Sequence, residues 1–160
     1  MTLNRVGLMA AILCLGLAAA GCAHKPKDTG ASNGVVPGSQ ADLAQNVGDR
    51  IFFDTDKYNV DAQSKATLQR QAAWLAKWSN VSVTIEGHCD ERGTREYNLA
   101  LGDRRANATR DALVAAGVAA SRIKTISYGE ERPDCVESSD ACWAKNRRAV
   151  TVVTSGGPAS

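Results

Sequence analysis

The chain has 160 residues, which is enough for one domain of ordinary size. Hydrophobic residues make up 44% and charged residues 22%, a balance that excludes a wholly disordered chain. The formal net charge of +2 argues against a strongly basic nucleic-acid-binding protein, and five cysteines raise the question of export.

The first segment has the pattern of an export signal. Arg5 is the only charged residue before a continuous apolar run, residues 6–20, which is shorter than the ~20 residues that span a bilayer. A charged start, a short apolar centre and small residues at the end predict a secretory signal peptide over residues 1–21. The alternative that stays open is an ordinary signal peptide followed by an incidental cysteine.

Small residues followed by Cys22 resemble the bacterial lipobox, in which the signal is cut before a cysteine that becomes lipidated. This resemblance implies that Cys22 carries diacylglycerol and an N-acyl chain such as palmitate. Because Ala23 rather than Asp follows, it also implies an outer-membrane anchor with the folded domain in the periplasm.

Residues 22–49 are predicted to be a lipidated N-terminus and a flexible linker. Glycine, proline and small polar residues dominate this stretch, and its few branched apolar residues cannot bury a core. As a coil, ~27 residues average ~30 Å from end to end, so the linker lets a membrane-held domain work away from the bilayer. A short disordered tail is expected over residues 156–160.

The predicted elements begin after the linker. Residues 51–53 predict a short strand, and Asp61 is placed to cap a helix that ends near Trp78. Apolar residues recur on one face of that helix at Leu68, Ala72 and Leu75.

A half-buried strand follows at residues 81–86, where apolar and polar residues alternate. After a loop over residues 87–93, Thr94 is placed to cap a second long helix that ends near Ala116. Gly117 occupies the left-handed closing position.

The last predicted elements are a strand over residues 123–128, a short helix capped by Asp140 and ending at Arg147, and a strand over residues 149–154. Alternation of strands and helices with these lengths indicates one layer of helices on one sheet.

The second long helix carries an arginine where an apolar residue is expected. Its apolar positions fall within a ~60° stripe that should pack on the sheet; they are Tyr97, Leu101, Ala108, Ala112 and Ala115. Arg105 projects about 20° beyond this stripe, beside Asn98, and a charge there is costly unless a partner answers it. Two interpretations remain open: a side chain that reaches solvent or forms an internal salt bridge, or a fork that recognises a carboxylate.

Asp90 follows immediately on a predicted strand end, where sites are commonly built. An anion and a cation at the same junction of loop and helix can hold a zwitterion, with the ammonium on Asp90 and the carboxylate on Arg105. Composition alone does not name that ligand.

The run from Thr84 to Ala106, with Gly-His-Cys-Asp-Glu-Arg-Gly-Thr at its centre, closely resembles the OmpA-like family of peptidoglycan-binding domains. Further matches lie at residues 53–58, 127–133 and 145–150, so the resemblance, with the lipobox and linker, covers essentially the whole chain. It implies an OmpA-like domain over residues 50–155 with an α+β fold. The expected architecture is a two-layer sandwich in which one mixed sheet carries helices on one face.

The resemblance implies non-covalent binding of the diaminopimelate-containing stem peptide of peptidoglycan, and thus a tether between the outer membrane and the cell wall. In the family, the residues that match Asp90 and Arg105 hold the diaminopimelate ammonium and carboxylate. Further implied ligand-binding residues are Asp54, Thr55, Asp56, Arg92, Asn98, Leu101 and Asn146.

The same resemblance implies partners in the Tol–Pal system of cell division and envelope integrity: TolB, on a surface that overlaps the peptidoglycan pocket, and other Tol components. The alternative is an exported protein-interaction module whose main ligand is a periplasmic protein such as TolB.

Removal of the signal and lipidation of Cys22 leave three cysteines. Cys135 and Cys142 lie seven positions apart across an acidic loop in an oxidising compartment, so we predict a disulfide, the alternative being two free thiols. Cys89 is then a buried, inert thiol.

The run His88-Cys89-Asp90-Glu91 does not predict a metal site, because adjacent residues near a strand end point to opposite sides. A catalytic Cys–His pair would need a third, orienting group, and the sequence supplies none. We therefore expect no metal, no cofactor and no enzymatic activity. The basic residues over 145–148 lack interleaved aromatic residues and do not predict nucleic-acid binding.

Overall fold

The structure is a computed structural model, and it describes residues 34–157. The predicted signal peptide, the lipidation site Cys22 and residues 158–160 of the predicted tail lie outside the described residues. Within the described part, no helix combines the length and the apolar character needed to cross a membrane.

Four strands form one mixed sheet in the order β1-β4-β2-β3. The antiparallel pairs join β1 (Arg50–Phe52) to β4 (Arg148–Ser155) and β4 to β2 (Ser82–His88). The third pair, β2 with β3 (Ile123–Gly129), is parallel. The prediction of one mixed sheet is confirmed.

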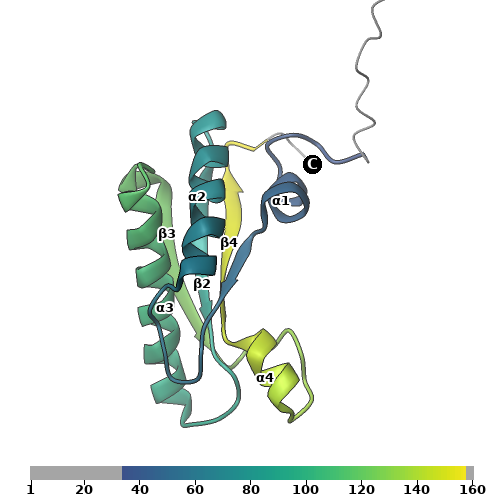
Figure 1. Ribbon diagram of the computed structural model, residues 1–160, viewed down its shortest axis with the longest axis vertical. Helices are drawn as coiled ribbons and strands as arrows, with labels where there is room; N and C mark the ends of the chain where they lie inside the picture. The colour runs from purple at the N-terminus through teal and green to yellow at the C-terminus, as the bar shows by residue number, and fades with distance from the viewer. Residues whose placement is uncertain (1–33, 158–160) are drawn as a thin grey trace, which may run out of the picture. The chain divides into compact units, whose positions relative to one another are not determined.

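Two long helices, α2 (Ala62–Lys77) and α3 (Arg95–Ala115), lie side by side on one face of this sheet (Figure 1). The predicted α+β sandwich with helices on one face is therefore confirmed. The core lies between the layers, where α2 buries Leu68, Ala72 and Leu75 as the spacing predicted.

Local signals in the sequence set the helix ends. The Asp61 carboxylate accepts a hydrogen bond from the Ser64 backbone N at 2.7 Å, and the Thr94 hydroxyl accepts one from the Tyr97 backbone N at 3.2 Å. Gly117 has a φ of 98° just beyond α3, as expected for its closing position.

The buried face of α3 differs from the prediction. Tyr97 and Ala115 of the predicted stripe are exposed, whereas Arg105 lies in the middle of the buried face rather than beside it. The buried residues of α3 are Asn98, Leu101, Gly102, Arg105, Ala106, Thr109 and Leu113. Leu101 and, in part, Ala112 of the predicted stripe face the core. Many of the other buried residues are small or polar, so the buried face is displaced around the helix from the apolar stripe.

A close approach of α3 to the sheet explains this burial. Gly87 of β2 faces Gly102 of α3, and a β-carbon on Gly87 would overlap the Gly102 carbonyl. A β-carbon on Gly102 would likewise overlap the Ser127 hydroxyl on β3. The two glycines let helix and strand meet backbone to backbone, which brings the next turn of α3 over the end of β2.

The remaining connections are short. A 3₁₀ turn, η2 (Ala120–Arg122), precedes β3, and α4 (Asp140–Asn146) precedes β4. The N-cap of α4 is Ser139, whose hydroxyl accepts from the Cys142 backbone N, and not Asp140 as predicted. The strand β2 also runs two residues into the expected loop, to His88.

Cys135 and Cys142 form a disulfide in the structure, with their Cα atoms 5.1 Å apart, and it closes the loop before α4. Cys89 is a free, buried cysteine.

The carboxyl end of the predicted linker is ordered. A helical turn, α1 (Gln40–Asp42), continues into a π-helical turn, η1 (Leu43–Val47), and Leu43 is completely buried in the core. The Asp42 carboxylate accepts from the Trp74 indole nitrogen at 2.9 Å. The folded unit thus begins about ten residues before the predicted boundary. This segment has no apolar helix face, and one buried leucine together with polar contacts to residues distant in the sequence holds it against the domain.

Candidate functional site

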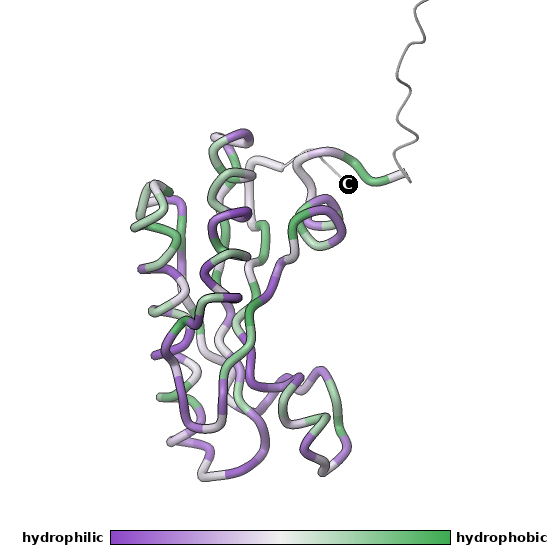
Figure 2. The backbone as a smooth tube through the Cα atoms, viewed as in Figure 1, coloured by the Kyte–Doolittle hydropathy of each residue, from purple (hydrophilic) through white to green (hydrophobic). Residues whose placement is uncertain are grey.

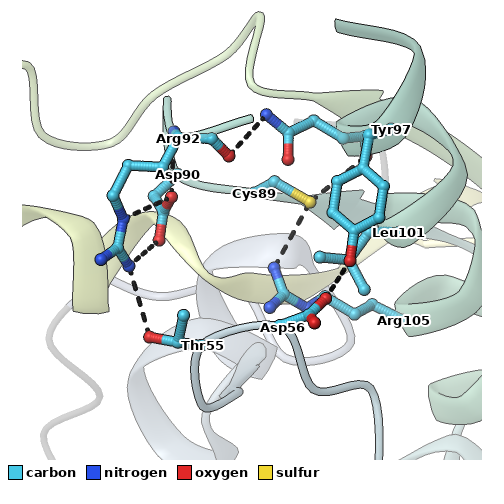
Figure 3. Close-up of a pocket in the computed structure, with 9 residues that line it drawn as sticks. Thr55, Asp56, Cys89, Asp90, Arg92, Tyr97, Leu101 and Arg105 are labelled. Carbon is cyan, nitrogen blue, oxygen red and sulfur yellow. Dashed lines mark hydrogen bonds and ion pairs between the residues drawn. The ribbon is translucent and has the colours of Figure 1, made fainter. Parts of the chain in front are cut away.

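A pocket of about 190 Å³ lies where the end of β2 meets the start of α3 and the loop between β1 and α2 (Figure 3). The loop between β1 and α2 and the loop between β2 and α3 are both strongly hydrophilic (Figure 2). The pocket contains groups of both charges, two carboxylates and two guanidiniums. Its lining residues are Thr55, Asp56, Cys89, Asp90, Arg92, Tyr97, Asn98, Leu101 and Arg105.

Asp90 is buried and its carboxylate is held by two arginines. Oδ1 accepts from the backbone N and from Nε of Arg92, both at 3.1 Å. Oδ2 accepts from Nη2 of Arg92 at 2.8 Å and from Nη1 of Arg147 at 3.2 Å. Burial alone would raise the pKa of Asp90, but these hydrogen bonds outweigh it and the pKa is lowered, so the group is ionised at neutral pH.

The two arginines on Asp90 differ in how firmly they are held. The side chain of Arg147 is 14% exposed, and its Nε also donates to the Phe53 carbonyl at 3.0 Å. The side chain of Arg92 is 39% exposed and stacks on the Trp143 ring at 4.3 Å from its centroid. Arg147 therefore supports Asp90 from behind, whereas Arg92 lies over it on the solvent side.

Arg105 is fully buried and clamps two segments together. Its Nε donates to the Lys57 carbonyl at 2.8 Å and its Nη2 to the Asp54 carbonyl at 3.1 Å, both in the loop after β1. Its Nη1 donates to the His88 carbonyl at the end of β2, at 2.8 Å. The guanidinium thus ties the loop that carries Asp56 to the sheet.

No carboxylate of residues 34–157 lies within 4 Å of the Arg105 guanidinium, so the interpretation as an internal salt bridge does not hold there. Burial lowers the pKa of Arg105, which reflects how poorly the cation is solvated. Of its five N–H groups, three meet carbonyls and one meets only the Cys89 sulfur, a weak acceptor, at 3.4 Å. Two N–H groups are therefore available to an incoming anion.

Asp56 and Tyr97 form the wall of the pocket next to Arg105. The Tyr97 hydroxyl donates to the Asp56 carboxylate, so a loop residue and a residue of the first turn of α3 meet across the pocket edge (Figure 3). Asp56 has a φ of 58°, a left-handed conformation that side chains other than glycine seldom adopt. The contacts of Arg105 on either side of Asp56 hold this turn in place.

The structure brings most of the predicted site residues into this one pocket. Thr55, Asp56, Asp90, Arg92, Asn98, Leu101 and Arg105 all line it. Asp54 contributes only its carbonyl, to Arg105. Asn146 lies elsewhere and has a structural part, because its side chain accepts from the backbone N of Asp134 and of Cys135 and donates to the Cys135 carbonyl.

Sequence reasoning missed three residues of the site. Cys89 and Tyr97 line the pocket, and Arg147 holds Asp90. Cys89 and Tyr97 lie within the motif that predicted the site, directly beside the predicted site residues Asp90 and Asn98. That adjacency in the sequence could have identified them. Arg147 lies in the matched run 145–150, but nothing in that run indicated its contact with Asp90, which is 57 positions away and meets it through the pairing of β4.

The arrangement is suited to binding rather than to bond cleavage. Burial raises the pKa of the Cys89 thiol, which donates to the Asn98 carbonyl at 3.2 Å and is held in its protonated form. In the described part of the chain, no group of three or more His, Cys, Asp or Glu side chains could hold a metal ion. Opposed charges around a small cavity can instead hold an ammonium and a carboxylate together.

Comparison with known proteins assigns the chain to one family. The profile of the OmpA family matches residues 52–147. Relatives named peptidoglycan-associated lipoprotein, from Agrobacterium fabrum and Rhizobium meliloti, are each 55% identical to the chain. The alignments cover 91% and 98% of this chain and 86% and 92% of those relatives. The chain therefore belongs to the OmpA family, among its peptidoglycan-associated lipoproteins.

Solved structures agree with this assignment. The crystal structure of the peptidoglycan-associated lipoprotein from Burkholderia pseudomallei is 42% identical, with a TM-score of 0.64, over 66% of this chain and 90% of that one. The C-terminal domain of Helicobacter pylori MotB, at 20% identity and a TM-score of 0.63, covers 67% of this chain and 84% of that one and shares the fold. The relatives are named for association with peptidoglycan and not for a reaction.

Proposed function

We propose that this protein binds the diaminopimelate-containing stem peptide of peptidoglycan non-covalently, in the pocket between Asp90 and Arg105. The free end of diaminopimelate carries one ammonium and one carboxylate on the same carbon. A pocket that offers an ionised carboxylate and an unpaired guanidinium from opposite sides has the complementary charges (Figure 3).

The observation that carries this proposal is the state of Arg105. Its cation is fully buried, has no ion pair among the described residues and faces a cavity. A ligand carboxylate would accept the two available N–H groups, one on Nη1 and one on Nη2, in a bidentate pair. It would also supply the counter-charge that the fold does not.

On the other side, the ligand ammonium replaces part of the Arg92 contact with Asp90. An ionised carboxylate has about four acceptor positions, and Arg92 and Arg147 together make four hydrogen bonds to Asp90. Arg92 is the more exposed of the two, so its side chain moves to admit the ammonium while Arg147 keeps its position.

Binding of the full-length protein, in detergent, to purified cell-wall sacculi tests the proposal. Asp90→Asn removes the charge that receives the ammonium, and at least a tenfold loss of binding is expected. Asp49→Asn is the matched control, because Asp49 is also buried and paired with an arginine, Arg50 at 2.9 Å, but lies outside the pocket. Equal binding by both variants and the unchanged protein would refute the assignment.

The proposal extends to a place in the cell envelope. A lipid on Cys22 would hold the amino-terminal end at the outer membrane, and the folded domain would grip the wall in the periplasm. Stable anchoring needs two or more acyl chains, as lipidated cysteines of this kind carry. Many anchored copies on one polymer would gain avidity even if each pocket binds modestly.

A second candidate function is docking to a periplasmic protein such as TolB, within the Tol–Pal system. The observation that favours it is Val136, which is 83% exposed and directly follows Cys135 in the disulfide-closed loop beside the site. The disulfide restrains the loop that carries this apolar side chain, so a protein partner would cover it at little cost in loop ordering. A competition experiment tests it: soluble stem peptide should displace TolB from the protein, and Val136→Ser should weaken TolB binding while sacculus binding is unchanged.

A further inference from the structure

An exposed arginine next to the pocket has no counter-charge among residues 34–157. Arg104, one residue before Arg105, places its guanidinium carbon 5.6 Å from the Tyr58 ring centroid and 5.9 Å from that of Tyr97. The two rings are themselves exposed, by 49% for Tyr58 and 43% for Tyr97. Tyr97 also lines the pocket, so Arg104 lies just behind the pocket wall.

The charge of Arg104 is not paired with an opposite charge within the described chain. No carboxylate of residues 34–157 lies within 4 Å of it, whereas Arg95, nine residues earlier on the same helix, pairs with Glu131. Contacts with the faces of two aromatic rings steady a guanidinium without using its N–H groups. Its donors have no acceptor in the described part of the chain, so they remain free for one that a ligand provides.

We propose that Arg104, steadied by Tyr58 and Tyr97, binds a second carboxylate of the ligand, outside the pocket that holds the first. This inference rests on the proposed function, because it assigns a further part of the same stem peptide. In that peptide, diaminopimelate follows a D-glutamate whose α-carboxylate is free, and it can be followed by a D-alanine with a free terminal carboxylate. Both are carboxylates of a neighbouring residue.

The dimensions are compatible with either source. The head group in the pocket lies at the end of the diaminopimelate side chain, so a neighbouring carboxylate lies one side chain and about one residue, ~3.3–3.6 Å, further along the peptide. The Arg104 guanidinium carbon lies 5.9 Å from the ring centroid of Tyr97, a residue of the pocket wall, so a carboxylate just outside the pocket is within its reach. The rings of Tyr58 and Tyr97 also offer apolar surface over which the peptide backbone can lie. The charged pocket would then fix the diaminopimelate head group, and Arg104 the direction of the chain.

Calorimetric titration of the full-length protein with soluble stem peptides tests the assignment. Three ligands are needed: the free acid, the same peptide with the D-glutamate α-carboxylate amidated, and the same peptide with its terminal carboxylate amidated. Arg104→Ala should weaken binding of the free acid by roughly three- to fivefold, the range for an exposed ion pair. Arg104→Lys should recover part of this loss.

The two amidated ligands distinguish the two possible sources of the carboxylate that Arg104 binds. The unchanged protein should lose the same three- to fivefold with whichever amide removes the carboxylate that Arg104 binds, and Arg104→Ala should then show no further loss with that ligand. Arg110→Ala, on an arginine of the same helix that contacts Asp111, is the matched control and should leave all three affinities unchanged.

Two results would overturn the inference: equal affinities of Arg104→Ala and the unchanged protein for the free acid, or an Arg104→Ala loss that is the same for all three ligands. A failure of the proposed function looks different. In that case the unchanged protein itself does not bind the free acid, or Asp90→Asn binds it normally.

Discussion

The guanidinium of Arg92 covers both carboxylate oxygens of Asp90, with Nε 3.1 Å from Oδ1 and Nη2 2.8 Å from Oδ2. In this state the Asp90 carboxylate is already paired with a cation of the chain itself, the guanidinium of Arg92. Binding of an ammonium there is an exchange of one cation for another. A ligand without a positive charge at that point would leave Asp90 worse satisfied than before, which favours zwitterionic head groups.

Arg92→Ala is therefore expected to tighten binding of the stem peptide, by roughly two- to fivefold, because it removes the competing half-exposed ion pair. Calorimetric titration measures the change. Arg95→Ala removes an exposed arginine paired with Glu131, outside the pocket, and should have no effect. Weaker binding by Arg92→Ala would show instead that Arg92 contacts the ligand directly.

Arg105→Lys should abolish detectable binding of the stem peptide and lower the free energy of unfolding by about 2 kcal/mol. A lysine ammonium cannot reach the carbonyls of both segments that the guanidinium joins, and it offers no bidentate fork. Urea unfolding and sacculus binding measure the two effects.

The control for that variant is Arg122→Lys. Arg122 also donates to three backbone carbonyls, those of Val81, Leu75 and Trp78 at 2.8–2.9 Å, and it lies outside the pocket. It should lose comparable stability and keep full binding. If Arg105→Lys were as stable as the unchanged protein and still bound sacculi, Arg105 would have neither of its assigned parts.

Acid should destabilise the fold through His88. Burial, followed by the nearby charges of Arg148 and Arg132, lowers the pKa of His88 from 6.5 to about 4. Its ring nitrogens have no hydrogen-bond partner in the described chain, and Nε2 lies 3.6 Å from a Glu86 carboxylate oxygen. Since the unfolded chain binds this proton more readily than the folded one, the stability due to neutral His88 is complete above pH 6.5 and falls as the pH drops towards 4.

The expected loss reaches roughly 2–3 kcal/mol at pH 4. Unfolding by urea at a series of pH values measures it, and His88→Gln should lack this part of the slope while keeping the part due to carboxylates. A steeper slope in His88→Gln, or stability that rises on acidification, would mean that Glu86 holds a protonated histidine in the fold.

Replacing Cys135 and Cys142 together by serine should lower the free energy of unfolding by about 2–3 kcal/mol, the loop-closure value for so short a loop. Adding reductant to the unchanged protein should give the same loss, and reductant should not affect the double variant. Cys89→Ala, at the free cysteine, is the control for effects of reductant on thiols. Identical stability with and without reductant would show that the bond contributes nothing to folding.

Much of the fold was predictable because its signals are local. Asp61 and Thr94 cap helices through their own side chains, and the alternation around Val83 marks a strand buried on one face. The buried face of α3 was not predictable from apolar periodicity, since its position depends on two glycines that meet across layers, Gly87 and Gly102.

The residues of the site likewise divide into those that local sequence patterns predicted and those that they did not. Asp90 and Arg105 stand in one motif, so their joint location at the pocket was expected. Arg147 and the order in residues 40–47 depend on contacts between positions 57 and 32 residues apart, Arg147 with Asp90 and Trp74 with Asp42. A short stretch of sequence does not reveal contacts between residues so far apart. For the same reason Asn146, the neighbour of Arg147, was expected to line the pocket, although it lies outside it.

The fastening of Gln40 has a mechanical consequence. Its side chain accepts from the Val153 backbone N at 2.7 Å and donates to the Thr151 carbonyl at 3.3 Å, both on β4, while Leu43 is buried a turn later. Tension applied through the amino-terminal segment would load these contacts first. The three-residue edge strand β1 and the loop that Arg105 clamps would be strained only after they had given way.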